Sequence, residues 1–167
     1  MLKRLILFRH GKSDWDASFS NDHDRPLTER GIKTARQMGK LLATASQVPE
    51  LVISSTAERA SRTAELALEA GRWSAELQRS GVLYASSPAR ILTFLQQLPD
   101  ICGQVMLVGH EPTWSGLVRA FTGAQVRMPT AAMAAMQFPI MQWQDLAFDS
   151  GELIWLLQPK FFKQLSL

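Results

Sequence analysis

Two of the three histidines in this 167-residue chain stand just after apolar runs of sequence, His10 with Arg9 between and His110 immediately. His10 follows the run 5–8, and His110 follows the run 105–109. Each run is typical of a buried strand, because it is rich in apolar residues and shows little alternation with polar ones. In open α/β sheets, ligands bind outside the carboxyl ends of the strands. The pattern therefore predicts that both imidazoles lie at one edge of a parallel sheet, where they could act on a ligand.

Arginine and glycine residues accompany these imidazoles. Arg9 and Gly11 flank His10, and Arg59 lies one turn into the helix expected after a third apolar run, 51–54. A guanidinium group matches phosphate oxygens bidentately, and a glycine lets the backbone approach an anion closely. We therefore predict a phosphate site that contains a nucleophile, formed at one edge of the sheet by two arginines, two histidines and a glycine-containing turn.

Other kinds of site fit these residues less well. A two-histidine metal site normally needs carboxylate or thiolate partners, and adjacent arginines would repel a divalent cation, so we expect no metal and no cofactor. The chain has neither a G-x-S-x-G nucleophile elbow nor a P-loop. For either histidine taken alone, a hydrogen-bonded structural role is the alternative.

Size and composition indicate one domain, 1–167, of a soluble globular class. Apolar residues make up 46% of the chain and charged residues 20%, which is ordinary for such proteins. The lone Cys102 cannot form an internal disulfide, which favours a cytoplasmic location. No segment approaches the length of a membrane span, so no membrane association is expected. The net charge is +3 with the arginines dispersed, so nucleic-acid binding is not expected either.

The elements that must position the candidate residues alternate along the chain. Thr28 and Ser87 are expected as helix N-caps, and Gly71 and Gly123 as helix stops. We expect strands at 2–8, 51–54, 105–108, 136–138 and 153–157, a short extended segment at 82–84, and helices at 28–44, 57–70, 89–98 and 112–122. This alternation predicts an α/β fold in three layers, with a mostly parallel central sheet and helices on both faces. Right-handed crossovers would place the carboxyl ends of the first three major strands on one edge.

Four segments, in this order, resemble the signatures of the histidine phosphatase superfamily, which includes the phosphoglycerate mutases. They are LFRHG at 7–11, RPLTERG at 25–31, SSTAERASRTA at 54–64 and VGHEP at 108–112. The small size and the short chain between the segments are similar to the SixA-like branch, the phosphohistidine phosphatases. The resemblance implies a phosphoglycerate mutase-like fold.

The resemblance also implies a metal-independent phosphatase with assigned roles. His10 would be the nucleophile and would form a phosphohistidine intermediate. Arg9, Gly11 and Arg59 would bind the phosphoryl oxygens, and His110 would hydrogen-bond to them as charge builds in the transition state. Phosphoryl transfer needs such positioning and charge stabilisation more than covalent chemistry from the protein.

One segment departs from the family pattern. Larger members carry an acid, which protonates the leaving oxygen, after a segment similar to 81–84, whereas this chain continues with Ala-Ser-Ser at 85–87. Loss of the acid would hinder hydrolysis of alkyl phosphates more than hydrolysis of an N-phosphoryl group, since a protonated imidazole leaves readily. Glu111 is the candidate proton donor in its place, and Asp22 and Asp24 are alternatives.

The favoured substrate is therefore phosphohistidine on a protein, such as a histidine phosphotransfer domain in signal transduction. The same chemistry on a small phosphate ester is the first alternative. A non-catalytic phosphoprotein-binding module is the second, although such a module would be expected to lack His10 or an arginine. A mutase or a nucleic-acid-binding domain has less support.

Overall fold

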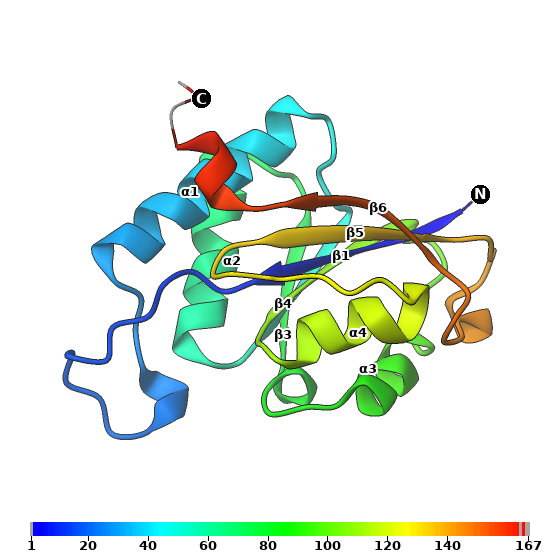
Figure 1. Cartoon of the computed structure of the whole chain (residues 1–167), viewed down its shortest axis with the longest axis horizontal. Helices are drawn as coiled ribbons and strands as arrows, with labels where there is room; N and C mark the ends of the chain where they lie inside the picture. Colours follow the sequence, from blue (N-terminus) through cyan, green and yellow to red (C-terminus); the bar gives the residue numbers. More distant parts are fainter. Residues whose placement is uncertain (1, 164, 166–167) are drawn as a thin grey trace.

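The computed structural model of the chain describes residues 2–163 and 165. Its strands form a six-stranded sheet in the order β3-β2-β4-β1-β5-β6 (Figure 1). The strands are β1 (Lys3–Arg9), β2 (Leu51–Ser55), β3 (Glu76–Ser80), β4 (Gln104–Gly109), β5 (Met133–Phe138) and β6 (Glu152–Leu157). The α-helices are α1 (Glu29–Thr44), α2 (Glu58–Gly71), α3 (Pro88–Leu95) and α4 (Thr113–Thr122). Among the described residues, no helix is long and apolar enough to cross a membrane.

The predicted α/β fold with a mostly parallel sheet is confirmed. The two strands at one side of the sheet, β5 and β6, form antiparallel pairs. β1 pairs in parallel with β4, β4 with β2, and β2 with β3. By contrast, β5 runs antiparallel to β1, and β6 runs antiparallel to β5. Antiparallel neighbours need no helical crossover, and the connection 139–151 contains only the short 3-10 helix Trp143–Asp145.

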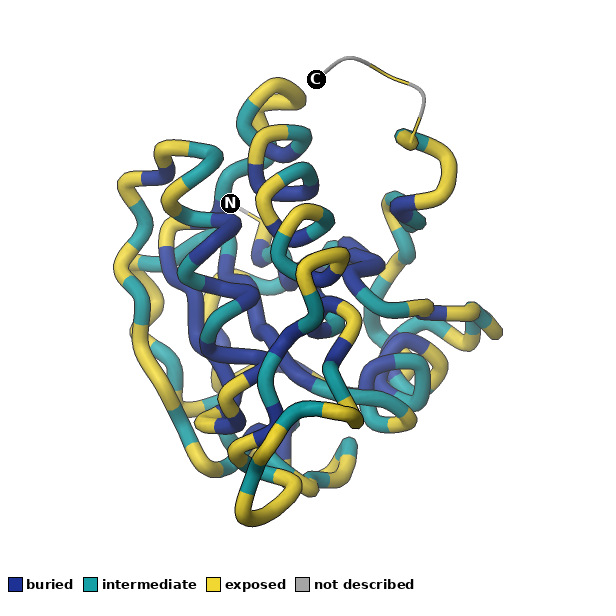
Figure 2. The backbone as a smooth tube through the Cα atoms, turned by 90° about the vertical axis from the view of Figure 1, so that its left-hand side faces the viewer, coloured by how far each residue is buried: buried dark blue, intermediate teal, exposed yellow. Residues whose placement is uncertain are grey.

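Helices cover both faces of the sheet, which explains the unbroken apolar runs of its inner strands. Alternate residues of β1 enter different cores. Leu5 and Leu7 pack in the cluster that includes residues of α3 and α4, whereas Ile6 and Phe8 pack in the cluster that includes residues of α1 and α2. Figure 2 shows the buried stretches of chain in the middle of the molecule and the exposed turns around them.

The helix ends follow the expected local chemistry. The Thr28 hydroxyl accepts a hydrogen bond from the Gly31 amide (3.0 Å), and the Ser87 hydroxyl accepts one from the Arg90 amide (3.3 Å). Both predicted N-caps are therefore confirmed. Gly123 ends α4 in the left-handed conformation, with φ 78°, as its glycine predicted.

The predicted role of Gly71 as the residue after α2 is wrong. Gly71 is the last helical residue, and Arg72 takes the left-handed conformation, with φ 54°. The glycine is needed for close packing, because a Cβ there would lie 2.5 Å from the Gly39 carbonyl oxygen and would also meet the Trp73 indole nitrogen.

The predicted extended segment at 82–84 is also wrong, and an edge strand was missed. Residues Gly81–Leu83 form a 3-10 helix, and the strand β3 immediately precedes it. The sequence of β3, ELQRS, is mostly polar and solvent-exposed because β3 is the edge strand beside β2. A polar edge strand carries no run of apolar residues by which it could be found.

The contact between α1 and α2 generates a stability prediction. A Cβ at Gly39 would lie 2.5 Å from the Cα of Ala67 and would also clash with its carbonyl oxygen. Backbone cannot move aside as a flexible side chain can, so we expect Gly39→Ala to destabilise the fold by about 1–3 kcal/mol, in spite of the better helix propensity of alanine. Urea unfolding measures this change.

Gly116 in α4 supplies the matched control. A Cβ there would meet only Pro88 Cγ, at 3.8 Å, which is ordinary contact. Gly116→Ala should therefore stabilise the protein by about 0.5–1 kcal/mol, the usual gain in a helix. Equal effects of the two substitutions would contradict the close approach of α1 to α2.

Candidate active site

The parallel register of β1 and β4 brings the two histidine segments together. Arg9 lies opposite Gly109 in the ladder, and the His10 amide donates to the Gly109 carbonyl at 3.0 Å. His10 and His110 therefore leave neighbouring strands at the same edge, and their ring centroids are 5.2 Å apart. The sequence predicted this meeting from the apolar runs alone.

A cavity of about 230 Å³ lies at this edge of the sheet. The four predicted catalytic side chains line it together with three further charged groups: Arg9, His10, Arg59, His110, Glu111, Arg25 and Lys12. A larger groove, of about 720 Å³, lies along α1 and is lined by none of these seven residues. The chemistry of the lining residues, and not the size of the cavity, identifies the smaller one as the candidate site.

His10 is held as a neutral imidazole. Its Nδ1 lies 2.7 Å from the Gly11 carbonyl oxygen. Because a carbonyl only accepts, Nδ1 must carry the hydrogen, and Nε2 therefore keeps its lone pair. Burial, helped by the neighbouring guanidinium groups, lowers the pKa of His10 to about 3, although the Gly11 carbonyl favours the charged ring. The imidazole is thus neutral at physiological pH.

Gly11 follows His10 in the chain but does not line the cavity. Its amide donates to the Thr63 hydroxyl at 3.0 Å. A Cβ at this position would lie 2.8 Å from the Gly31 carbonyl oxygen, so the glycine is required by the backbone packed against it. The structure gives Gly11 a part in orienting His10, since its carbonyl fixes the imidazole tautomer.

His110 stands beside His10 with one ring nitrogen available. Its Nε2 lies 2.9 Å from the Ser55 hydroxyl, at the end of β2, and its buried Nδ1 has no hydrogen-bond partner in the described part of the chain. Burial and the nearby Arg59 guanidinium lower the pKa of His110 to about 4. The sequence analysis gave Ser55 no role and missed this contact, which depends on the pairing of β2 with β4.

The arginines of the cavity use only some of their hydrogen-bond donors in contacts within the protein. Arg9 donates to the Met128 carbonyl at 2.9 Å, and Arg59 donates to the carbonyl oxygen and the carboxylate of Asp22, at 2.7 and 3.0 Å. Over residues 2–163 and 165, the buried Nε atoms of Arg9, Arg59 and Arg25 make no hydrogen bond. Unpaired buried donors are costly. The positive charge of three guanidinium groups around one cavity suits an anion.

Arg25 and Asp22 form a network that the sequence did not predict. The buried Arg25 donates to the Ser13 hydroxyl and, at 2.9 Å, to the Asp22 carboxylate. That carboxylate also accepts from Arg59 and, at 2.9 Å, from the Tyr84 hydroxyl. Burial opposes the charge of Asp22, but the hydrogen bonds from these partners outweigh it and hold the pKa of Asp22 well below its ordinary value. Asp22 is therefore ionised and unsuited to donate a proton at neutral pH.

The remaining acids differ in their placement. Glu111 lines the cavity, with both carboxylate oxygens hydrogen-bonded to Ser115, at 2.7 Å from its amide and 2.7 Å from its hydroxyl. Asp24 is exposed and accepts from Asn21, outside the cavity lining. Within the described ranges, no group of three or more His, Cys, Asp or Glu side chains could hold a metal ion.

Comparison with known proteins agrees with this geometry. The model of the histidine phosphatase superfamily (branch 1) matches residues 5–80. An uncharacterized protein of Mycobacterium leprae is 30% identical over 158 residues, which cover 87% of this chain and 96% of that protein.

Solved structures extend the similarity over nearly the whole fold. A putative phosphohistidine phosphatase SixA from Nakamurella multipartitia is 28% identical, with a TM-score of 0.80 over 95% of this chain and 97% of that one. A putative SixA from Agrobacterium tumefaciens is 26% identical, also with a TM-score of 0.80, over 95% and 99% of the two chains. From its motifs, its site and these relatives, the chain belongs to the histidine phosphatase superfamily, in the SixA-like group of branch 1.

Proposed function

We propose that this phosphatase removes the phosphoryl group from phosphohistidine on a protein, through a phosphorylated His10 and without a metal. One observation carries the proposal. A neutral imidazole with its Nε2 lone pair available lines a cavity together with three guanidinium groups, each with an unpaired Nε. This arrangement has the nucleophile and the positive charge that phosphoryl transfer requires.

The reaction would proceed in two displacements. In the first, Nε2 of His10 attacks phosphorus, the bond from phosphorus to the substrate nitrogen breaks, and the departing imidazole takes up one proton. In the second, water attacks the phosphorylated His10, the bond between phosphorus and Nε2 breaks, and inorganic phosphate leaves as the water releases one proton. Two easier steps replace one difficult displacement.

The surrounding donors would stabilise the charge of the transferred group. Arg9 and Arg59 would bind its oxygens, with Arg25 as a third guanidinium in the same cavity. We assign His110 the tautomer in which Ser55 donates to Nε2, so that its buried Nδ1–H donates to a phosphoryl oxygen. Glu111 at the cavity wall is the candidate for supplying the proton to the leaving group.

The nature of the leaving group favours phosphohistidine over a small ester. The segment 85–87 offers no carboxylate, and Asp22 is held ionised by its partners. An alkoxide would need a strong proton donor, whereas imidazole is a better leaving group once protonated. The SixA-like relatives, which are putative phosphohistidine phosphatases, support the same substrate. We therefore propose a histidine phosphotransfer domain in the cytoplasm as the partner.

A substrate panel tests this function. Without added metal, we expect the enzyme to dephosphorylate a histidine phosphotransfer domain at least about tenfold more efficiently, in kcat/KM, than a phosphoserine peptide or sugar phosphates, because of the missing acid. A chelator should leave the rate unchanged. His10→Ala should reduce turnover to the background rate. Preference for a sugar phosphate would move the function to the small-ester alternative, and activity without His10 would refute the intermediate.

A comparison of two arginines on α2 distinguishes the effect of a charge in the cavity from the effect of a charge on the surface. Arg59 lines the cavity, whereas Arg62 is partly exposed and pairs with Glu65 at 3.2 Å. We expect Arg59→Ala to lower kcat/KM by about 10²–10³, the usual cost of removing one transition-state donor. Arg62→Ala, the control, should change it less than about twofold, because exposed pairs contribute little. Steady-state kinetics on the phosphorylated domain measures both, and similar losses would argue against a specific role for Arg59.

The charge state of His10 gives a pH prediction. A pKa lowered from 6.5 to about 3 means that the ring stays neutral as the pH falls through the range in which an ordinary histidine becomes charged. Protonation would place a positive charge among guanidinium groups in a buried site. We expect the NMR shift of the His10 Cε1 proton, assigned with His10→Gln, to stay nearly constant between about pH 8 and 5. A titration midpoint near 6.5 would contradict the neutral nucleophile.

A further inference from the structure

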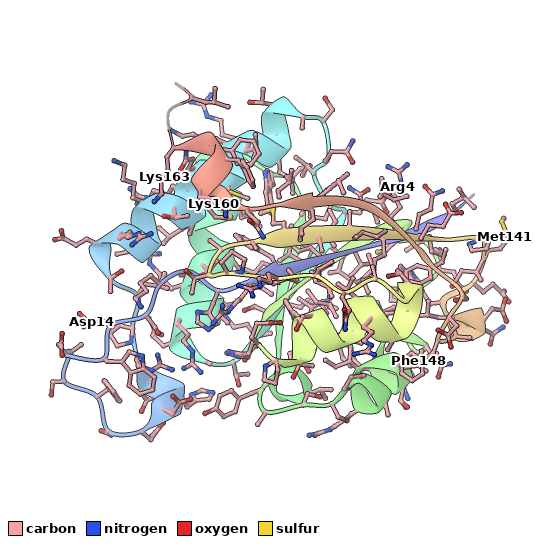
Figure 3. All side chains as sticks on the ribbon, viewed as in Figure 1. Arg4, Asp14, Met141, Phe148, Lys160 and Lys163 are labelled. Carbon is pink, nitrogen blue, oxygen red and sulfur yellow. The ribbon has the colours of Figure 1, made fainter. Side chains whose placement is uncertain are left out.

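Trp15 lines the catalytic cavity while most of its surface is exposed to solvent. Its relative exposure is 66%, whereas His10 and Arg59 in the same cavity are 7% and 5% exposed. Figure 3 shows the neighbouring Asp14 on the loop that projects beyond the carboxyl end of β1. Trp15 is therefore at the mouth of the cavity, outside the position that a phosphoryl group must reach.

The indole ring is supported from behind by a buried cation. The guanidinium carbon of Arg25 lies 3.6 Å from the centroid of the Trp15 ring, which is a close cation–π contact. Arg25 is itself fixed, because it is buried and donates to Ser13 and Asp22. One face of the indole is thus covered and held in place.

The backbone around Trp15 is fixed as well. The Asp14 amide donates to the Pro26 carbonyl at 2.8 Å, and Ser13 forms an antiparallel bridge with Leu27. Phe19 packs against the indole edge, with ring centroids 6.4 Å apart. An exposed aromatic ring that is ordered before binding loses little conformational entropy when a partner covers it.

The depth of the nucleophile indicates what would cover this ring. A phosphorylated side chain must extend into the cavity to reach His10, so the rest of a large substrate meets the residues at the mouth. A compact phosphate ester such as a sugar phosphate has little further surface to contact Trp15, whereas a folded polypeptide has much more. Tryptophan is also among the residues that contribute most to binding in protein interfaces.

We propose that Trp15 is the anchoring contact for the polypeptide that carries the phosphohistidine, packing against apolar side chains next to the phosphorylated residue. This inference rests on the proposed function and adds to it a surface that distinguishes a protein substrate from a small one. Trp15 acts on binding of the polypeptide and takes no part in bond breaking.

Two substrates with the same scissile bond provide the test. We compare kcat/KM for a histidine phosphotransfer domain phosphorylated on its histidine with kcat/KM for free N-phosphohistidine. We expect Trp15→Ala to lower the value for the protein about tenfold, as for other interface anchors, and the value for free phosphohistidine less than about threefold. Trp15→Phe keeps an aromatic ring on Arg25 and should restore most of the activity on the protein.

Ile101 supplies the matched control. It is an apolar side chain with 90% exposure. It lies before the amino-terminal end of β4, whereas the cavity lies at the carboxyl ends of β1 and β4. Ile101→Ala should change neither substrate's kcat/KM. Thermal unfolding followed by circular dichroism verifies that each variant is folded.

The outcomes separate this inference from the proposed function. Equal losses on both substrates, or no loss on either, would overturn the role of Trp15 while leaving the proposed function intact. If the wild-type enzyme cleaves neither phosphohistidine substrate, the proposed function fails and the inference fails with it. A loss confined to the protein substrate supports both.

Discussion

The active site depends on the parallel pairing of β1 with β4. Their register puts Arg9 opposite Gly109, so the two imidazoles that follow leave the sheet side by side. Both strands bury side chains on both faces, and successive residues of β1 enter different cores. A slip of one residue would exchange those faces and turn each strand's side chains to the wrong core. The packing that stabilises the sheet therefore also fixes the distance between His10 and His110.

The charges of the cavity serve two purposes at once. In the proposed reaction the guanidinium groups near His10 attract a phosphoryl group. Burial, helped by the same groups, disfavours a protonated imidazole. The groups proposed to bind the phosphoryl group thus also help to keep the His10 imidazole neutral. Asp22 reduces the repulsion between these positive charges, because its carboxylate forms ion pairs with both Arg25 and Arg59. The Nε atoms of these arginines take no part in this pairing and have no hydrogen-bond partner in the described part of the chain.

Sequence reasoning found the parts of this arrangement that depend on local pattern. The apolar runs located β1 and β4, the caps located α1 and α3, and the residues after the runs gave the cavity its histidines. The pairing of Asp22 with Arg59 joins residues 37 positions apart, and that of Asp22 with Tyr84 joins residues 62 apart. No periodicity or turn signal encodes such contacts, because they arise when the segment 12–28 folds over α2. The edge strand β3 was missed for a related reason, since only its neighbour β2 makes it a strand.

The substrate must be selected by the loops, because the groups that act on phosphorus do not distinguish what phosphorus is attached to. An imidazole nucleophile and guanidinium donors suit an ester and a phosphoramidate equally. Under the proposed function, the parts that would meet the remainder of the substrate are the segments 12–24 and 81–87, which lie outside the sheet and the α-helices. The hydrogen bond from Tyr84 to Asp22 joins these two loops, and through Asp22 it connects them to Arg59. One hydrogen-bonded network therefore connects both loops to a guanidinium group that lines the cavity.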